Sequence, residues 1–313
     1  MILLRKIYTA HVSPRGTYSF SLTASCYALG WDYDGTRAYV PFCSEGTYGC
    51  AVAWDDGDIH IDIYLERPND EALEMGIKTA IWSLGLAENL DEYYSLIAKD
   101  RLLGIICKRL RGIHMRAVAS LWEGLLVGIC QQNASFRQGW LMVKRLREVL
   151  GEELILEDIG RTIRTLPSPQ AIIRKANTLR TAGVGYREKT ILSAAKAFTT
   201  SDYETLEEIR GIGQYTARLA RILALRKYDE FPVDRWFSRL IPWVYESEDV
   251  SWDRAKVENY TRKLWGPWRG LSAVMLTIVT AAEPIGPLLR ALSSRTVNPM
   301  PDKPSPLTMW RYL

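Results

Sequence analysis

Two helical segments meet at a glycine-bracketed turn in the stretch Leu206-Glu207-Glu208-Ile209-Arg210-Gly211-Ile212-Gly213-Gln214-Tyr215-Thr216-Ala217. The first backbone N–H groups of the second segment and its helix dipole suit a phosphate oxygen. Because glycine has no Cβ, a nucleic-acid backbone can approach Gly211 and Gly213 closely. The stretch therefore predicts a hairpin that binds a phosphate backbone, with Gln214 and Thr216 as adjacent polar contacts.

A carboxylate follows one helix later, in the sequence Phe231-Pro232-Val233-Asp234. Its position just after Pro232 predicts that Asp234 is a helix N-cap, with its side chain held by backbone N–H groups. A fixed carboxylate would then lie near whatever the hairpin holds. Hairpin and carboxylate together favour an enzyme that grips DNA and acts on a nucleotide.

The composition is that of an ordinary globular chain of 313 residues, 47% hydrophobic and 24% charged. No apolar run reaches the length of a membrane span. The N-terminus, Met1-Ile2-Leu3-Leu4-Arg5-Lys6, lacks the order of a secretory signal. We therefore expect an intracellular, cytoplasmic and nucleoid-associated protein with no membrane partner.

The net charge of +4, from 40 basic and 36 acidic residues, is mild for a nucleic-acid binder. Such a protein must concentrate its basic residues on one face. The expected concentration follows the hairpin, at Arg218, Arg221, Arg226, Lys227, Arg235 and Arg239. The five cysteines form no C-x-x-C pair and the three histidines are scattered, so neither set has metal-ligand spacing.

The pattern of the chain predicts an α+β fold. Residues 1–68 are expected to form an N-terminal antiparallel β-sheet domain, with strands at Tyr18–Leu22 and Ile59–Tyr64 and a hairpin turn at Asp56-Gly57. Residues 69–295 are expected to be all-α, with helices capped by Asn69 and by Ser168 before Pro169. Residues 296–313 contain four prolines and predict an extended or loosely docked tail.

The hairpin and the Pro232-Val233-Asp234 sequence resemble the helix-hairpin-helix superfamily of DNA glycosylases. Gly183-Val184-Gly185-Tyr186-Arg187 is similar to a stretch of the 8-oxoguanine branch, and Trp265-Gly266-Pro267-Trp268-Arg269 is similar to the late helix start of the alkyl-base (3-methyladenine) branch. The resemblance covers roughly residues 100 to 290. It implies two helical subdomains around a cleft, a monomer, and double-stranded DNA containing a damaged base as the partner.

The resemblance also implies that Asp234 is the catalytic residue. Cleavage of an N-glycosidic bond builds positive charge on the deoxyribose, and a carboxylate near C1′ can stabilise that charge or activate water. Members that also cleave the strand have a Lys at the position of Tyr215, and its amine forms a Schiff base. Because a phenol cannot form an imine, Tyr215 predicts a monofunctional enzyme and a residue that stacks on the flipped base.

Further site residues are implied by the same resemblance. Gln132 and Asn133 match the loop that fills the gap left by an extruded base. The main-chain carbonyls of Glu207, Ile209 and Ile212 match a site for a monovalent cation that bridges to DNA. We expect no cofactor for the chemistry and no iron–sulfur cluster, because the C-terminal region has no cysteine.

Three functions stay open. A monofunctional glycosylase acting on alkylated purines is favoured. An enzyme for 8-oxoguanine or deaminated bases is the alternative, with lyase activity from a displaced lysine such as Lys189 or Lys227. A non-catalytic helix-hairpin-helix DNA-binding module is the third.

Overall fold

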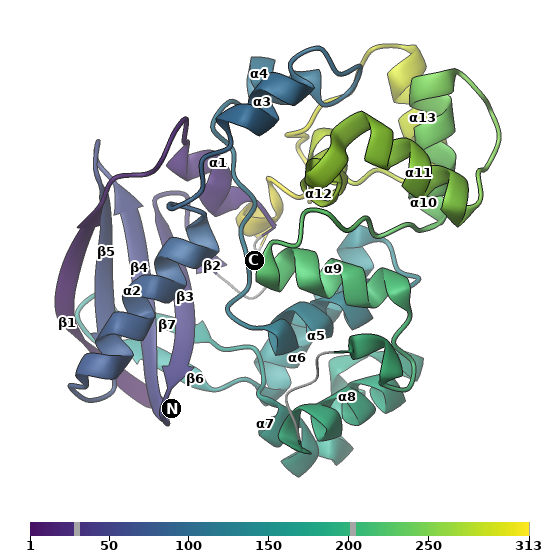
Figure 1. Ribbon diagram of the computed structural model, residues 1–313. Helices are drawn as coiled ribbons and strands as arrows, with labels where there is room; N and C mark the ends of the chain where they lie inside the picture. The colour runs from purple at the N-terminus through teal and green to yellow at the C-terminus, as the bar shows by residue number, and fades with distance from the viewer. Residues whose placement is uncertain (28–31, 201–204, 313) are drawn as a thin grey trace.

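The computed structural model describes residues 1–27, 32–200 and 205–312. A sheet lies on one side of the molecule and a body of helices on the other (Figure 1). The described strands are β1 Ile2–Val12, β2 Asp32–Tyr33, β3 Arg37–Ser44, β4 Thr47–Asp55, β5 Ile59–Leu65, β6 Glu153–Leu156 and β7 Arg161–Arg164. No helix in these ranges is long and apolar enough to cross a membrane.

The sheet has the strand order β2-β3-β4-β5-β1-β6-β7. The predicted hairpin at Asp56-Gly57 is confirmed, because β4 and β5 pair antiparallel and Gly57 takes a φ of +117°. The prediction that residues 69–295 are all-α is wrong. Strand β6 pairs parallel with β1, and β7 pairs antiparallel with β6. Their apolar side chains, Leu154 and Ile163 among them, form a small second core with Leu4.

A second correction concerns Tyr18–Leu22, which was expected to be a strand. Helix α1 spans Phe20–Ser25 and buries Phe20, Thr23 and Ala24. This spacing of three and four residues puts the buried side chains on one face of a helix. The alternation of Tyr18, Phe20 and Leu22 is therefore incidental.

Twelve further helices are described after α1. They are α2 Asp70–Leu84, α3 Asp91–Ile97, α4 Gly104–Arg109, α5 Leu121–Gln131, α6 Phe136–Leu150, α7 Pro169–Arg174, α8 Glu188–Thr200, α9 Gln214–Leu225, α10 Arg235–Ile241, α11 Arg254–Trp265, α12 Arg269–Val279 and α13 Ile285–Ser293. The predicted caps are confirmed: Asn69 accepts the Ala72 N–H at 2.8 Å, and Ser168 accepts the Ala171 N–H at 3.1 Å. The helical pattern of the sequence also predicts a helix at 202–210; this segment lies partly outside the described residues, and its described part forms a short 3₁₀ helix at Leu206–Glu208.

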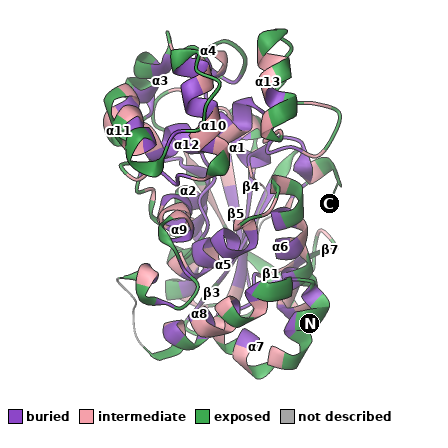
Figure 2. Cartoon of the chain, turned by 90° about the vertical axis from the view of Figure 1, so that its right-hand side faces the viewer, coloured by how far each residue is buried: buried purple, intermediate pink, exposed green. Residues whose placement is uncertain are grey.

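Helix α5 is largely buried in the helical half of the molecule, and α9 packs against it with half of its residues buried (Figure 2). Two glycines of α5 allow them to cross closely. A Cβ at Gly124 would lie 2.6 Å from the Ala220 carbonyl oxygen, and one at Gly128 would lie 3.0 Å from the Thr216 carbonyl oxygen. This contact fixes the first turn of α9, which carries the predicted DNA grip.

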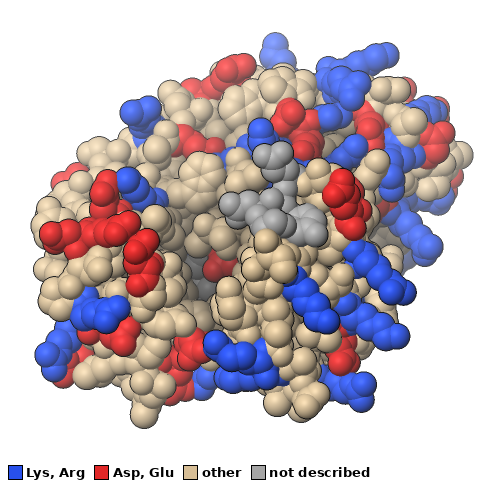
Figure 3. Space-filling view, turned by 60° about the horizontal axis from the view of Figure 1, so that its bottom comes forward, with Lys and Arg blue, Asp and Glu red and all other residues tan. Residues whose placement is uncertain are grey.

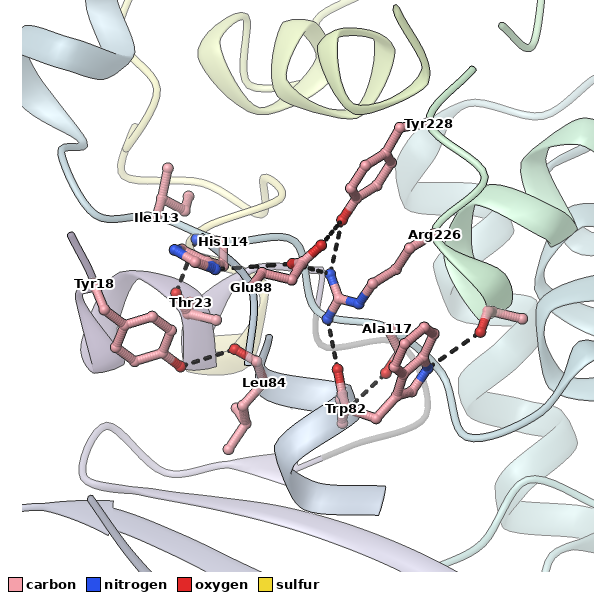
Figure 4. Close-up of polar contacts among 12 residues, drawn as sticks. Tyr18, Thr23, Trp82, Leu84, Glu88, Ile113, His114, Ala117, Arg226 and Tyr228 are labelled. Carbon is pink, nitrogen blue, oxygen red and sulfur yellow. Dashed lines mark hydrogen bonds and ion pairs between the residues drawn. The ribbon is translucent and has the colours of Figure 1, made fainter. Parts of the chain in front are cut away.

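A buried polar network ties the end of α2 to the end of α9 (Figure 4). Arg226 donates to Glu88 at 2.5 Å and to the Tyr228 hydroxyl at 2.8 Å, and its side chain is only 6% exposed. His114 lies 3.8 Å from the same carboxylate, and burial lowers the pKa of His114 to about 4. The network joins the sheet side of the molecule to the helix that follows the hairpin.

The C-terminal tail is tightly docked, in contrast to the loose tail that its prolines predicted. Leu307 and Met309 are buried, and the Trp310 ring meets Tyr33 edge-on at 5.0 Å. The Pro306 carbonyl accepts the Tyr27 N–H at 2.8 Å. The tail therefore holds the chain just after α1, where Tyr27 reaches the helical body.

Candidate active site and nucleic-acid interface

The two hairpin glycines have different physical roles. Gly211 has a φ of +92°, and a Cβ there would lie 2.5 Å from the Thr190 hydroxyl, so the turn itself requires glycine. Gly213 is the N-cap of α9, is exposed and has no atom within 4 Å of an added Cβ. Its open surroundings leave the free N–H groups of the first turn of α9 accessible to an anion.

The carbonyls expected to hold a cation lie in the same turn. Ile209 already accepts the Ile212 N–H at 2.9 Å through its main-chain oxygen, which leaves one lone pair. The Glu207 carboxylate is bound by Arg221 and is not needed as a ligand. Main-chain oxygens are suitable donors for a hard cation. The donor set fits the expected ion, and the cation stays a prediction.

Asp234 is the N-cap of α10, as the sequence predicted. Its Oδ1 accepts the Phe237 N–H at 2.8 Å. Burial raises the pKa of Asp234 from 3.8 to about 6, while hydrogen bonds from the backbone N–H groups of Phe237 and Trp236 oppose that rise. The carboxylate is thus fixed in direction and costly to ionise.

Asp234 lies in the wall of a cavity of about 280 Å³ that gathers side chains from distant parts of the chain. Tyr215 lines the same cavity, so the structure brings together the two residues predicted for chemistry and base binding. The remaining lining residues are Tyr27, Val127, Gln131, Ala134, Ser135, Phe136, Leu219, Leu223, Pro232, Trp236, Phe237, Ala273, Val274, Thr277, Ala282, Glu283 and Pro284.

Aromatic rings make up much of the cavity wall. Tyr27 meets Phe136 edge-on at 5.5 Å, and the Trp236 indole donates to the Glu283 carbonyl at 2.8 Å. Burial raises the pKa of Tyr215, and the nearby Asp234 charge adds to the rise. Sequence analysis did not single out Tyr27, Phe136 or Trp236, since only the fold brings them to the hairpin.

Gln132 and Asn133, predicted to fill the gap left by the extruded base, lie in the turn between α5 and α6, beside the hairpin. The Gln132 amide donates to the Gly211 carbonyl at 3.5 Å. Arg187 donates to the Ile129 carbonyl at 3.1 Å and also to the Gln132 carbonyl. Asn133 is exposed with a φ of +48°, a conformation that Asn tolerates better than most residues. Arg187, from the segment similar to 8-oxoguanine enzymes, therefore anchors this loop.

The DNA contact predicted for the Thr216 side chain is corrected by its burial. Thr216 is 1% exposed and packs against Gly128 of α5, so only its backbone N–H remains available at the start of α9. Gln214, in contrast, is exposed, and its amide oxygen accepts from Arg254 at 2.7 Å.

The basic residues after the hairpin do not form the expected patch. Four of the six are engaged in ion pairs: Arg218 with Glu258, Arg221 with Glu207 and Glu230, Arg226 with Glu88, and Arg239 with Asp249. They neutralise carboxylates within the fold, so their charge is not free for a phosphate. Sequence alone could not show this, because the pairing depends on the fold, and two of the partners, Glu258 and Glu88, lie 40 and 138 positions from their arginines.

Positive charge gathers instead elsewhere on the helical half of the molecule. On the face shown in Figure 3, Lys and Arg side chains are dense on the right, whereas acidic side chains cluster on the left, over the sheet half. Exposed basic residues around the hairpin include Arg210 in the turn, Lys189 on α8 and Arg254 on α11. The described lining of the cavity contains no lysine, and Lys189 and Lys227 are both exposed.

Comparisons with known proteins agree with this geometry. The 3-methyladenine DNA glycosylase from Archaeoglobus fulgidus matches with a TM-score of 0.70 at 22% identity, covering 86% of this chain and 97% of that one. The 8-oxoguanine glycosylase/lyase of Clostridium acetobutylicum, in complex with double-stranded DNA containing cytosine opposite 8-oxoguanine, matches with a TM-score of 0.63 at 14% identity, covering 93% and 99%.

A distant sequence relative is also found. The probable N-glycosylase/DNA lyase of Methanothermobacter thermautotrophicus is 23% identical over an alignment of 211 positions that covers 57% of this chain and 66% of that relative. The matched part thus spans just under two thirds of the relative. No protein-family model matches the chain. The chain therefore has the fold of DNA glycosylases of solved structure, and its sequence is distantly similar to that of the Methanothermobacter protein.

Proposed function

We propose that this protein is a monofunctional DNA glycosylase that extrudes a damaged base from double-stranded DNA and hydrolyses its N-glycosidic bond, with alkylated purines as the favoured substrates. The observation that carries the proposal is the shared cavity of Asp234 and Tyr215, directly beside the exposed N-terminus of α9. A phosphate bound at that N-terminus would place the extruded nucleotide at the carboxylate.

Asp234 suits the hydrolytic step. Its Oδ1 is held by the Phe237 N–H, so the carboxylate is oriented before the substrate arrives. Burial makes its charge expensive, and a developing positive charge on the sugar would relieve that cost in the transition state. A water molecule activated at the same carboxylate would then complete the cleavage.

The cavity wall favours a large, electron-poor base. Tyr27, Phe136 and Tyr215 offer π-faces and ring edges. An alkylated purine that carries positive charge gains cation–π attraction there as well as stacking. The absence of a lysine from the described lining supports a mechanism that uses water rather than an amine.

A lesion panel tests the proposal. Labelled duplexes carrying alkylated, oxidised or deaminated bases would be incubated with the protein and analysed with and without alkali. We expect base release from an alkylated purine duplex, with strand breaks only after alkali. Strand cleavage without alkali, together with a borohydride-trapped complex, would instead favour the bifunctional alternative. Two of the similar proteins are named as lyases as well as glycosylases, which is consistent with that alternative.

The alternative of a binding module makes a different prediction. Such a protein would bind abasic-site DNA and release no base from any duplex in the panel. Release of a base by the wild type, lost in Asp234→Asn, separates the two.

A further inference from the structure

One side chain in the cavity wall has hydrogen-bonding capacity that the protein leaves unused. Gln131, the last residue of α5, lines the same cavity as the aromatic residues. Its amide nitrogen is buried and has no hydrogen-bond partner among the described residues. A buried amide without a partner destabilises a fold, so a position of this kind in a ligand cavity points to a ligand that supplies the partner.

Without a ligand, this amide packs against α6. On α6, Gly139 lies directly against it: a Cβ there would be 2.5 Å from the Gln131 Cδ and Oε1 and 2.6 Å from its Nε2. Glycine in the interior of a helix weakens the helix, and here it makes room for the amide. Gln131 and Gly139 therefore act as a matched pair, one on each helix.

The backbone beneath Gln131 is also fixed. The Gln131 carbonyl accepts the Ala134 N–H at 3.3 Å, and Arg187 binds the carbonyls of Ile129 and Gln132 on either side. The backbone of Gln131 is thus positioned in advance, and only the terminal amide has to turn from Gly139 towards the cavity to meet a ligand, so little freedom is lost on binding.

We propose that Gln131 is a specificity-determining residue that reads the edge of the extruded base, and that it favours an alkylated adenine. A glutamine amide pairs with adenine through two hydrogen bonds, donating to N7 and accepting from the N6 amine. In 3-methyladenine both groups are free. In 7-methylguanine the N7 acceptor is blocked by the methyl group. This inference rests on the proposed glycosylase function.

The test uses methylated duplex DNA, which contains 3-methyladenine and 7-methylguanine together, and measures the release rate of each free base by chromatography. The wild type should favour 3-methyladenine. In Gln131→Leu the ratio of the two rates should fall about tenfold, as expected for the loss of one paired contact. Gly139→Ala, whose Cβ displaces the amide, should lower the ratio in the same direction. Gln170→Leu, the same change at an exposed position on α7, is the matched control and should leave the ratio unchanged.

Thermal unfolding accompanies these assays. Because Gln131→Leu removes a buried polar group without a partner, its melting temperature should equal or exceed that of the wild type. Should it unfold, Gln131→Met preserves the length of the side chain and serves for the same measurement. An unchanged ratio in a folded Gln131 variant, or an equal loss of both activities, would overturn the inference while leaving the glycosylase intact. Failure of the wild type to release either base would instead overturn the proposed function.

Discussion

Replacement of Asp234 by Asn should stabilise the protein at neutral and alkaline pH while abolishing its activity. The carboxylate has a pKa of about 6 in the folded protein against an ordinary value of 3.8. At about 1.4 kcal/mol per pKa unit, ionisation of Asp234 costs the folded state about 3 kcal/mol as an upper limit, which water in the open cavity reduces. Asn keeps the side-chain oxygen that accepts the Phe237 N–H, so the helix cap survives.

The pH dependence has a definite sign. Because the folded-state pKa of Asp234 is raised, the folded protein holds this proton more tightly than the unfolded chain does. The cost is therefore fully present above about pH 6 and disappears as the pH falls towards 4. The stability of Asp234→Asn relative to the wild type should be up to about 3 kcal/mol higher at pH 8 and nearly equal at pH 4.

Urea unfolding of both proteins at pH 4, 6 and 8 measures this difference in stability. Because both proteins contain the other titrating groups, such as His114, the contributions of those groups cancel in the difference. Asp253→Asn, the same change at the exposed N-cap of α11, is the matched control and should alter stability by less than about 0.5 kcal/mol. Equal stabilities of Asp234→Asn and the wild type at pH 8, or a difference that does not vary with pH, would refute the reasoning.

Three further predictions concern the hairpin, its basic neighbour and the buried network. Gly213→Val should fold normally, because no atom lies within 4 Å of the new Cβ, yet it should bind abasic-site DNA about tenfold more weakly, as measured by fluorescence anisotropy. Gly286→Ala on α13 is the control. Unchanged affinity in Gly213→Val would show that the hairpin is structural. Arg254→Ala should weaken binding and reduce the slope of log affinity against log salt by about one, whereas an unchanged slope would exclude a phosphate contact. Glu88→Gln should lower the free energy of unfolding by about 3 kcal/mol, because it leaves the buried Arg226 charge poorly compensated. A loss below about 1 kcal/mol in urea unfolding would contradict the role of Glu88 as the partner of that charge.

The parts of the site that the sequence predicted are local ones. The turn at Gly211 and the cap at Asp234 depend on residues within a few positions of each other, so glycine, proline and aspartate are informative there. The aromatic wall is different in kind. Tyr27 lines the cavity, and its backbone N–H is bound by the Pro306 carbonyl of the tail, a contact between distant parts of the chain.

The same distinction between local and long-range contacts explains the errors in the predicted fold. Strands β6 and β7 are four residues each, and β6 pairs with β1, a strand about 150 positions earlier, so no local pattern reveals the sheet that they join. The basic residues after the hairpin were assigned by type, and their pairing with carboxylates such as Glu258 depends on tertiary packing. A basic residue in a sequence predicts a positively charged surface only where no carboxylate neutralises it in the fold.

The central claim is that Asp234 drives base release by water. A single-turnover measurement tests it most directly: free base released from a 3-methyladenine duplex is followed over time for the wild type and for Asp234→Asn, at pH 5 to 8. We predict a wild-type rate that rises with pH through about 6 and a loss of at least about a hundredfold in the variant, whose duplex affinity is retained. A variant that releases the base as fast as the wild type would contradict the account.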